Sequence, residues 1–268
     1  RDGRKLWFQS EVSGFSHLYL VEVPSTGKSD AELPRPQVLT RGNYIATEPQ
    51  LSVEGRYLYF RANREHPGQY EIYRTTLTDG VIQRVTELGG MSSALLSPDG
   101  RQLLITHSES TRPPELFIQS AEPLATAVKF TDTVSDAFKR RPWIAPNHVA
   151  IPSSHGQNPI HSRLYLPPED RATKRPAIMF VHGAGYLQNA HKGWSGYSRE
   201  FMFHSFLAKR GFVVLDMDYR ASAGYGRDWR TAIYRHMGSV ELEDLRDGVD
   251  WMVENHGVDR DRIGVYGG

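Results

Sequence analysis

The sequence predicts an all-β part followed by an α/β part. Three observations support this: a turn-and-strand pattern that recurs three times in residues 1–132, a later alternation of apolar strands and helices, and glycines directly after two of the later strands. Repeats of about 40–50 residues that hold several short strands are typical of β-propeller blades. Alternating strands and helices are typical of a parallel sheet covered by helices.

The repeats share three phrases in a fixed order. Each repeat opens with an acidic residue, Gly and Arg before alternating apolar residues, continues with a second strand-like phrase, and closes on a Thr. Because complete propellers have about four to eight blades, we expect 1–132 to be a partial β-propeller of about three blades. Its first blade has no sequence ahead of it for an innermost strand. A β-sandwich with similar hairpins is the alternative. The phrases are 2–8, 17–20 and 38–40; 54–60, 71–74 and 84–86; and 99–105, 115–118 and 129–131.

Residues 133–152 are expected to contain a connector and the first strand of the second part. The basic run 139–141 before Pro142 is typical of a solvated loop. Apolar residues at 148–151 and 163–166 flank a segment rich in turn residues, which predicts a hairpin.

Residues 153–268 alternate strands and helices. Apolar runs at 177–181, 212–215 and 263–266 are typical of strands buried on both faces of a parallel sheet. Functional sites of such sheets lie beyond the carboxyl ends of the strands.

Two helices are expected between these strands. Ser198 and Ser239 are the predicted N-caps, and Gly211 and Gly257 the predicted ends. Helical spacing predicts that one face of the second helix is buried, formed by Leu242, Leu245, Val249 and Met252.

The first glycine-rich strand end follows residue 181. His182 and Gly183 begin a segment that continues through Gly185 to Tyr186. Glycines there let backbone N–H groups approach a ligand closely, as an oxyanion hole requires. In α/β-hydrolases a His-Gly-rich segment after an early strand supplies one such donor. An ordinary turn with a solvated His is the alternative.

The second glycine-rich strand end is Gly267 and Gly268. A buried strand that ends in Gly-Gly is typical of a nucleophile elbow, in which a strained turn carries the nucleophilic Ser. That Ser would be residue 269, beyond the chain. A phosphate-binding strand end is the alternative, but the chain has no matching phosphate loop.

Polar residues near these strand ends are interpreted as structural. Asp218 and Arg220 predict an ion pair that braces the following loop, with substrate binding as the alternative. Glu241, Glu243 and Asp244 suit the positive end of their helix. The eleven His residues show no metal-binding spacing, so no metal and no cofactor are expected.

These motifs resemble, in order, those of the prolyl oligopeptidase family of serine peptidases. The resemblance spans nearly the whole chain, and the dipeptidyl peptidase IV branch is the most similar. The segments that carry it are the Gly-Arg-x-Leu repeats, His182 to Gly185, the run 218–226, the run 259–268, and 96–100 with 111–114.

The resemblance implies a partial β-propeller followed by the N-terminal half of an α/β-hydrolase domain, in a fragment of an enzyme that cleaves short peptides after Pro or Ala. The Ser-His-Asp triad would lie beyond residue 268, so the chain alone is expected to be inactive. His182 and Gly183 would form the oxyanion region, Tyr186 would lie near the substrate, and Gly267 and Gly268 would flank the nucleophile. The acidic pair that holds the peptide N-terminus in dipeptidyl peptidases has no counterpart here.

Two other functions stay open: an esterase or acylaminoacyl peptidase of the α/β-hydrolase fold, and an inactive propeller-hydrolase scaffold that binds peptides or proteins. A net charge of +1 argues against nucleic acid as a partner. The longest apolar stretches are too short to insert in a membrane. A peptide substrate and a homodimer are the expected partners. The absence of Cys and the resemblance to often exported bacterial proteins favour a periplasmic or extracellular location.

Overall fold

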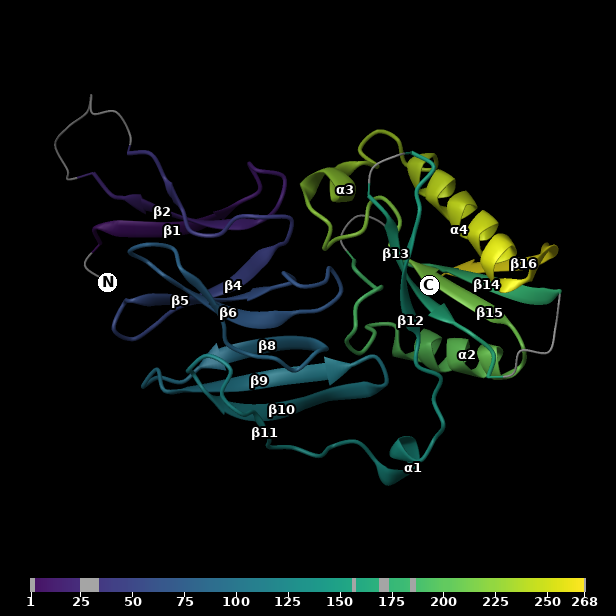
Figure 1. Cartoon of the computed structure of the whole chain (residues 1–268), viewed down its shortest axis with the longest axis horizontal. Helices are drawn as coiled ribbons and strands as arrows, with labels where there is room; N and C mark the ends of the chain where they lie inside the picture. The colour runs from purple at the N-terminus through teal and green to yellow at the C-terminus, as the bar shows by residue number, and fades with distance from the viewer. Residues whose placement is uncertain (1–2, 25–33, 156–157, 169–173, 184–186, 268) are drawn as a thin grey trace. The chain divides into compact units, whose positions relative to one another are not determined.

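The computed structural model describes residues 3–24, 34–155, 158–168, 174–183 and 187–267, and Figure 1 traces the chain. The chain divides into two compact units, which are described separately. The first unit is Arg1–His107, Glu115–Asp132 and Tyr225–Arg227; the second is Ser108–Pro114, Thr133–Gly224 and Asp228–Gly268.

The first unit contains three sheets in which strands adjacent in sequence are neighbours. Each predicted phrase contributes one strand, and the second and third sheets gain a further strand, β4 or β8, ahead of the Gly-Arg phrase. The sheets are β1 (Lys5–Ser10), β2 (His17–Glu22) and β3 (Gln37–Val38); β4 (Ala46–Leu51), β5 (Tyr57–Ala62), β6 (Glu71–Thr76) and β7 (Ile82–Arg84); and β8 (Met91–Leu96), β9 (Gln102–Glu109), β10 (Arg112–Ser120) and β11 (Val128–Lys129).

A hydrogen-bonded Thr closes the second and third sheets in the same way. Thr86 Oγ1 accepts the Ile72 N–H at 2.9 Å and donates to the Glu71 carboxylate at 2.6 Å. Thr131 does the same with the Leu116 N–H and Glu115. We call these contacts the Thr latches, and they explain why the closing Thr recurs.

The first sheet has a Thr latch with a different partner. Thr40 Oγ1 accepts the Leu18 N–H at 2.9 Å, and His17 Nδ1 lies 3.0 Å from it where the other sheets have Glu. The turns that open the phrases also repeat, with Gly3, Gly55 and Gly100 at φ of 74°, 71° and 72°. This left-handed conformation favours Gly, which accounts for its place in each phrase.

Alternate residues of β5 contribute to two different cores. Leu58 and Phe60 pack in a cluster with Leu18 of the first sheet. Tyr59, which lies between them, packs in a cluster with Leu103 of the third sheet. The middle sheet therefore buries both faces, one against each neighbouring sheet.

The second unit is a mixed five-stranded sheet of order β12-β13-β15-β14-β16 with four helices among the described residues. The hairpin β12–β13 is antiparallel, β13 pairs antiparallel with β15, and β14 pairs in parallel with both β15 and β16. The elements are β12 (Asn147–Ile151), β13 (Ile160–Tyr165), β14 (Arg175–Val181), β15 (Val213–Met217), β16 (Val258–Gly267), α1 (Asp136–Lys139), α2 (Ser198–Lys209), α3 (Arg227–Thr231) and α4 (Val240–His256). The predicted strands and two predicted helices are present, whereas α1 and α3 were not predicted.

Helices α2 and α4 pack on opposite faces of this sheet, as Figure 1 shows. Val214 of β15 is in the core cluster that includes Phe201 of α2. On the other face, a Cβ at Gly248 of α4 would lie 2.5 Å from Met217 Sδ. The glycine thus allows α4 to approach β15 closely.

The expectations for the helix termini and for the buried face of α4 were partly wrong. The N-cap of α2 is Tyr197 rather than Ser198, and Ser239 caps α4 without a side-chain hydrogen bond. Leu242 is 47% exposed. The fully buried residues of α4 are Asp244, Gly248 and Met252, because the close contact at Gly248 turns that stripe toward the sheet.

Strand β16 lies at one edge of the five-stranded sheet and is exposed in part. Its Val265 side chain is 64% exposed. Among the described residues, no helix is long and apolar enough to cross a membrane.

Candidate active site

The two glycine-rich strand ends lie side by side. In the parallel pair β14–β16, Phe180 pairs with Tyr266 and Val181 with Gly267. His182 and Gly183, which directly follow β14, therefore lie at the same end of the sheet as Gly267. A Cβ at Gly267 would lie 2.6 Å from the Val181 carbonyl oxygen, so this close approach needs Gly. Tyr186 and Gly268 lie outside the described residues.

The His182 side chain is buried and faces acceptors with both ring nitrogens. Nε2 lies 3.0 Å from Asp218 Oδ1, and Nδ1 lies 2.9 Å from the Gly183 carbonyl oxygen. Burial opposes protonation, but the hydrogen bond and the charge of Asp218 outweigh it and raise the pKa of the imidazole. A protonated ring donates to both acceptors at once, so His182 fixes the carbonyl of the next residue.

Asp218 joins the His182 segment to a second loop. Its Oδ1 accepts the Asn189 N–H at 2.7 Å and its Oδ2 accepts the Ala190 N–H at 3.0 Å. The carboxylate is fully buried. Because both oxygens accept hydrogen bonds, the buried charge is compensated.

Ser222 completes a buried Ser-His-Asp cluster, but its geometry differs from that of a catalytic triad. Ser222 Oγ lies 3.3 Å from His182 Nε2, the same nitrogen that binds Asp218. In a triad the Ser and the Asp bind different ring nitrogens, so that the ring can take a proton from one side while it is held on the other. This cluster therefore holds the loop rather than activating Ser222.

Two tyrosines also hold the His182–Gly183 segment. Tyr219 stacks on the His182 ring with the centroids 4.8 Å apart, and its hydroxyl donates to the His182 carbonyl oxygen. The Gly183 N–H donates to Tyr197 Oη at 3.3 Å. Gly183 itself is exposed, although its N–H already has Tyr197 as its partner.

The residue before the Gly-Gly pair is anchored from α2. Tyr266 Oη lies 2.6 Å from His204 Nε2. Burial lowers the pKa of His204 to about 3, with a smaller contribution from Arg163, so the ring is neutral and accepts from Tyr266. His204 could not be predicted as part of the site, because a single His on the buried face of a helix gives no signal of its partner.

The expected ion pair between Asp218 and Arg220 is wrong. Asp218 binds His182, whereas the Arg220 guanidinium binds Asp244 at 2.9 Å and Glu243 at 2.8 Å. The two acids, interpreted from sequence as serving only the helix end, thus bind the loop after β15 to α4. Glu241 does serve that end, where it accepts the Gly238 N–H.

One group of possible metal ligands occurs among the described residues. His155, Asp244 and Asp247 have ligand atoms within 4.8 Å of one another. Arg220 already compensates the charge of Asp244, and Asp247 accepts the Ser154 N–H at 2.9 Å. Both carboxylates therefore have protein partners.

Comparisons with known proteins match both halves of the chain to one family. Residues 1–114 match the Dipeptidyl peptidase IV (DPP IV) N-terminal region, and residues 197–268 match the Prolyl oligopeptidase family. The chain belongs to the prolyl oligopeptidase family. Within this family it is similar to dipeptidyl peptidase IV, as the sequence motifs predicted.

Individual relatives of this prolyl oligopeptidase family chain are distant in sequence. It is 24% identical to dipeptidyl peptidase 8 of Mus musculus over 97% of the chain and 32% of the relative, and 22% identical to dipeptidyl peptidase 4 of Trichophyton tonsurans over 96% and 33%. The chain thus spans about a third of the length of these curated relatives.

Solved structures share the fold of this family member. The crystal structure of Porphyromonas gingivalis dipeptidyl peptidase 4 matches with a TM-score of 0.80 and 21% identity over 100% of this chain and 36% of that one. A putative dipeptidyl aminopeptidase IV from Bacteroides ovatus matches with a TM-score of 0.81 and 24% identity, over 98% and 39%. Both units of the chain therefore have counterparts in the same solved proteins.

Proposed function

We propose that this chain is part of a serine peptidase that removes short peptides, dipeptides above all, after Pro or Ala. The three stacked sheets would be blades of a β-propeller, and the five-stranded sheet would be the first half of an α/β-hydrolase domain. The observation that carries this proposal is the register of β14 and β16, which sets His182 and Gly183 beside Gly267.

In the proposed reaction, each residue at the carboxyl ends of β14 and β16 has a role. A Ser that follows Gly268 in a longer protein attacks the scissile carbonyl, and a His–Asp pair further along takes its proton. The Gly183 N–H, which donates to Tyr197 Oη at 3.3 Å in this structure, would turn to the oxygen that becomes negative once substrate is bound. His182 fixes the Gly183 carbonyl and thereby orients this segment. Tyr186 is assigned to substrate binding, and Gly267 and Gly268 are assigned to the flank of the nucleophile.

The chain of 268 residues is proposed to be inactive by itself. In its buried Ser222–His182–Asp218 cluster, Asp218 Oδ1 and Ser222 Oγ both lie beside His182 Nε2, so the ring cannot relay a proton from Ser222. The comparison is between the chain and a longer protein that includes it, with Gly-Pro-p-nitroanilide as substrate and a fluorophosphonate probe as label. We expect turnover, and labelling of the Ser after Gly268, only in the longer protein.

Two results would overturn this assignment. Labelling at Ser222, or turnover by the 268-residue chain, would place the nucleophile inside it. Faster hydrolysis of p-nitrophenyl acetate than of the dipeptide anilide by the longer protein would favour an esterase instead.

A further inference from the structure

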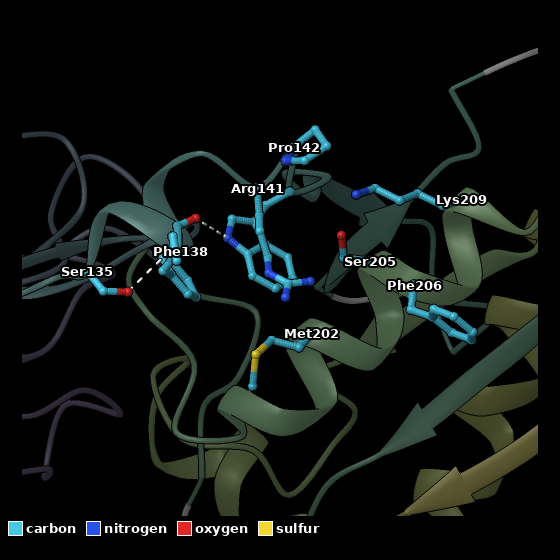
Figure 2. Close-up of a pocket in the computed structure, with 10 residues that line it drawn as sticks. Ser135, Phe138, Arg141, Pro142, Met202, Ser205, Phe206 and Lys209 are labelled. Carbon is cyan, nitrogen blue, oxygen red and sulfur yellow. Dashed lines mark hydrogen bonds between the residues drawn. The ribbon is translucent and has the colours of Figure 1, made fainter.

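A pocket of about 550 Å³ lies between α2 and the segment that contains α1, within the second unit. Figure 2 shows its lining. Four apolar side chains form most of the wall: Phe138, Trp143, Met202 and Phe206. The Phe138 and Trp143 rings lie 4.9 Å apart. Trp143 Nε1 donates to the Phe138 carbonyl oxygen at 3.2 Å, so the polar atom of the indole already has a partner in the protein.

Two cations line the same pocket. Arg141 comes from the segment after α1 and Lys209 from the last turn of α2, and in Figure 2 both side chains extend toward the middle of the pocket. Within the described ranges, neither forms an ion pair, and no carboxylate is among the residues that line the pocket. A concave apolar surface with two uncompensated positive charges is complementary to an anion with an apolar body.

Ser205 adds a third donor from the floor of the pocket. Its side chain is 1% exposed, and its Oγ accepts the Ile144 N–H at 3.0 Å. A hydroxyl that accepts one hydrogen bond still has its own hydrogen to donate. The described contacts of Ser205 leave that hydrogen without an acceptor in the protein. Guanidinium, ammonium and hydroxyl therefore all offer donors, which suits an acceptor-only group such as a carboxylate.

We propose that this pocket binds an aromatic carboxylate. The carboxylate pairs with Arg141 and Lys209 and accepts from Ser205, while the aromatic ring packs against Phe138, Trp143 and Phe206. Three aromatic walls favour a flat ring over an alkyl chain, because ring pairs gain energy beyond their buried area. The volume is within the range of about 300–1,000 Å³ that is usual for small-molecule sites. This site is separate from the proposed peptidase chemistry, since none of its residues lies at the carboxyl ends of β14 and β16.

Calorimetric titration of the 268-residue chain with 2-naphthoate tests the proposal. We expect saturable binding at one site, and binding of the neutral analogue 2-naphthamide to be weaker by about tenfold or more, because it lacks the charge that the cations recognise. Decanoate should also bind more weakly than 2-naphthoate. Equal affinity for 2-naphthamide, tighter binding of decanoate, or no saturable binding of 2-naphthoate would each overturn the proposal.

Variants locate the site. Arg141→Gln and Lys209→Gln should each weaken 2-naphthoate binding about tenfold. Arg140→Gln is the matched control, since Arg140 is the preceding residue of the same basic run and does not line the pocket. Equal loss with Arg140→Gln, or none with Arg141→Gln, would contradict the assignment. All three side chains are exposed, and far-UV circular dichroism verifies that each variant is folded. Binding of 2-naphthoate does not depend on peptidase activity, so this test can succeed even if a longer protein proves not to be a peptidase.

Discussion

At the scale of single residues, the charge of His182 can be measured directly. The imidazole is completely buried, and the Asp218 carboxylate lies 3.0 Å from its Nε2. Tyr219 stacks on the ring, Ser222 approaches the same nitrogen, and Asp216 adds a more distant negative charge. The net effect is a pKa above the ordinary His value of 6.5.

This raised pKa predicts how His182 contributes to stability as the pH changes. The folded chain binds the His182 proton more tightly than the unfolded chain, so the contribution is fully present below pH 6.5 and is lost as pH rises through the folded pKa. We expect the difference in free energy of unfolding between the wild type and His182→Gln to shrink from pH 6 to pH 9. Urea unfolding at several pH values measures it, and a difference that grows with pH would contradict the charged state.

Gly267 provides a second prediction at this scale. A Cβ at this position would meet the Val181 carbonyl oxygen at 2.6 Å, and this backbone atom cannot move without disturbing β14. We expect Gly267→Ala to lower the free energy of unfolding by about 1–3 kcal/mol, as overpacking does. Gly196→Ala is the control, because a Cβ there meets nothing within 4 Å. Equal effects of the two substitutions in urea unfolding would show that the contact is not tight.

The sequence indicated the position of the site better than the contacts of its side chains. Strand ends and glycines are local signals, and they pointed to His182, Gly183 and Gly267. The partners could not be predicted, because Asp218 is 36 residues from His182 and Asp244 is 24 residues from Arg220. Two neighbouring opposite charges, Asp218 and Arg220, suggested a pair that the fold separates.

At the scale of elements, the ion pair between Arg220 and Asp244 joins α4 to the loop after β15. The Asp244 side chain is completely buried, and burial raises the pKa of its carboxyl despite the guanidinium beside it. We expect Asp244→Asn to cost about 2–4 kcal/mol, because it leaves Arg220 without its buried partner. Asp250→Asn breaks the pair with Arg260, whose side chains are 54% and 58% exposed, and should cost less than about 1 kcal/mol.

Chemical denaturation measures the free energy of unfolding of the two variants, and both Asp residues lie in α4. A loss for Asp250→Asn as large as that for Asp244→Asn would mean that the helix charge, rather than the buried pair, sets the cost. Recovery of stability in the double variant Asp244→Asn, Arg220→Met would support the pair, since it removes both charges together.

The Thr latches give a prediction for the sheets. Thr86→Val keeps the shape of the side chain but leaves the Ile72 N–H and Glu71 without their hydroxyl partner, at an expected cost of about 1–3 kcal/mol. Thr47→Val is the matched control, because the buried Thr47 hydroxyl has no hydrogen-bond partner among the described residues. Thermal unfolding compares them, and a Thr47→Val variant that loses as much as Thr86→Val would argue against the latch.

The repeats made most strands of the first unit predictable. The Gly-Arg phrase and the closing Thr depend on turns and hydrogen bonds between nearby residues. Strands β4 and β8 were missed because their sequences share no phrase. In β4 the pairing with β5 is irregular between Thr47 and Gln50, and Glu48 has a φ of 52°, which breaks the expected alternation. The buried face of α4 was misplaced because close packing, rather than apolar content, selects it.

At the scale of the whole molecule, the core clusters of the two units have no described residue in common. Leu103 lies in a core cluster of the first unit, and Phe201 lies in the cluster of the second. We expect scanning calorimetry to show two transitions. Leu103→Ala should lower one and Phe201→Ala the other, each by the equivalent of about 2–5 kcal/mol. A single transition that both variants shift equally would show that the units unfold together.

The family could be predicted from the sequence because its motifs occur in order along the chain. The comparisons confirm that prediction for both halves. The pocket beside α2 could not be predicted, because its wall combines residues of the connector with residues of α2. These segments are far apart in sequence: the hydrogen bond from the Ile144 N–H to Ser205 Oγ spans 61 positions.

The Thr latches also have a kinetic consequence. Each latch joins residues only 14 to 23 positions apart, from Ile72–Thr86 to His17–Thr40. The sheet that carries the proposed site instead needs β16 to find β14, and Arg262 of β16 reaches the Lys174 carbonyl oxygen 88 positions earlier. Short loops close faster and at lower entropic cost than long ones. During synthesis the sheets of the first unit can therefore form as they emerge, whereas the edge that carries Gly267 assembles only after its last strand has been made.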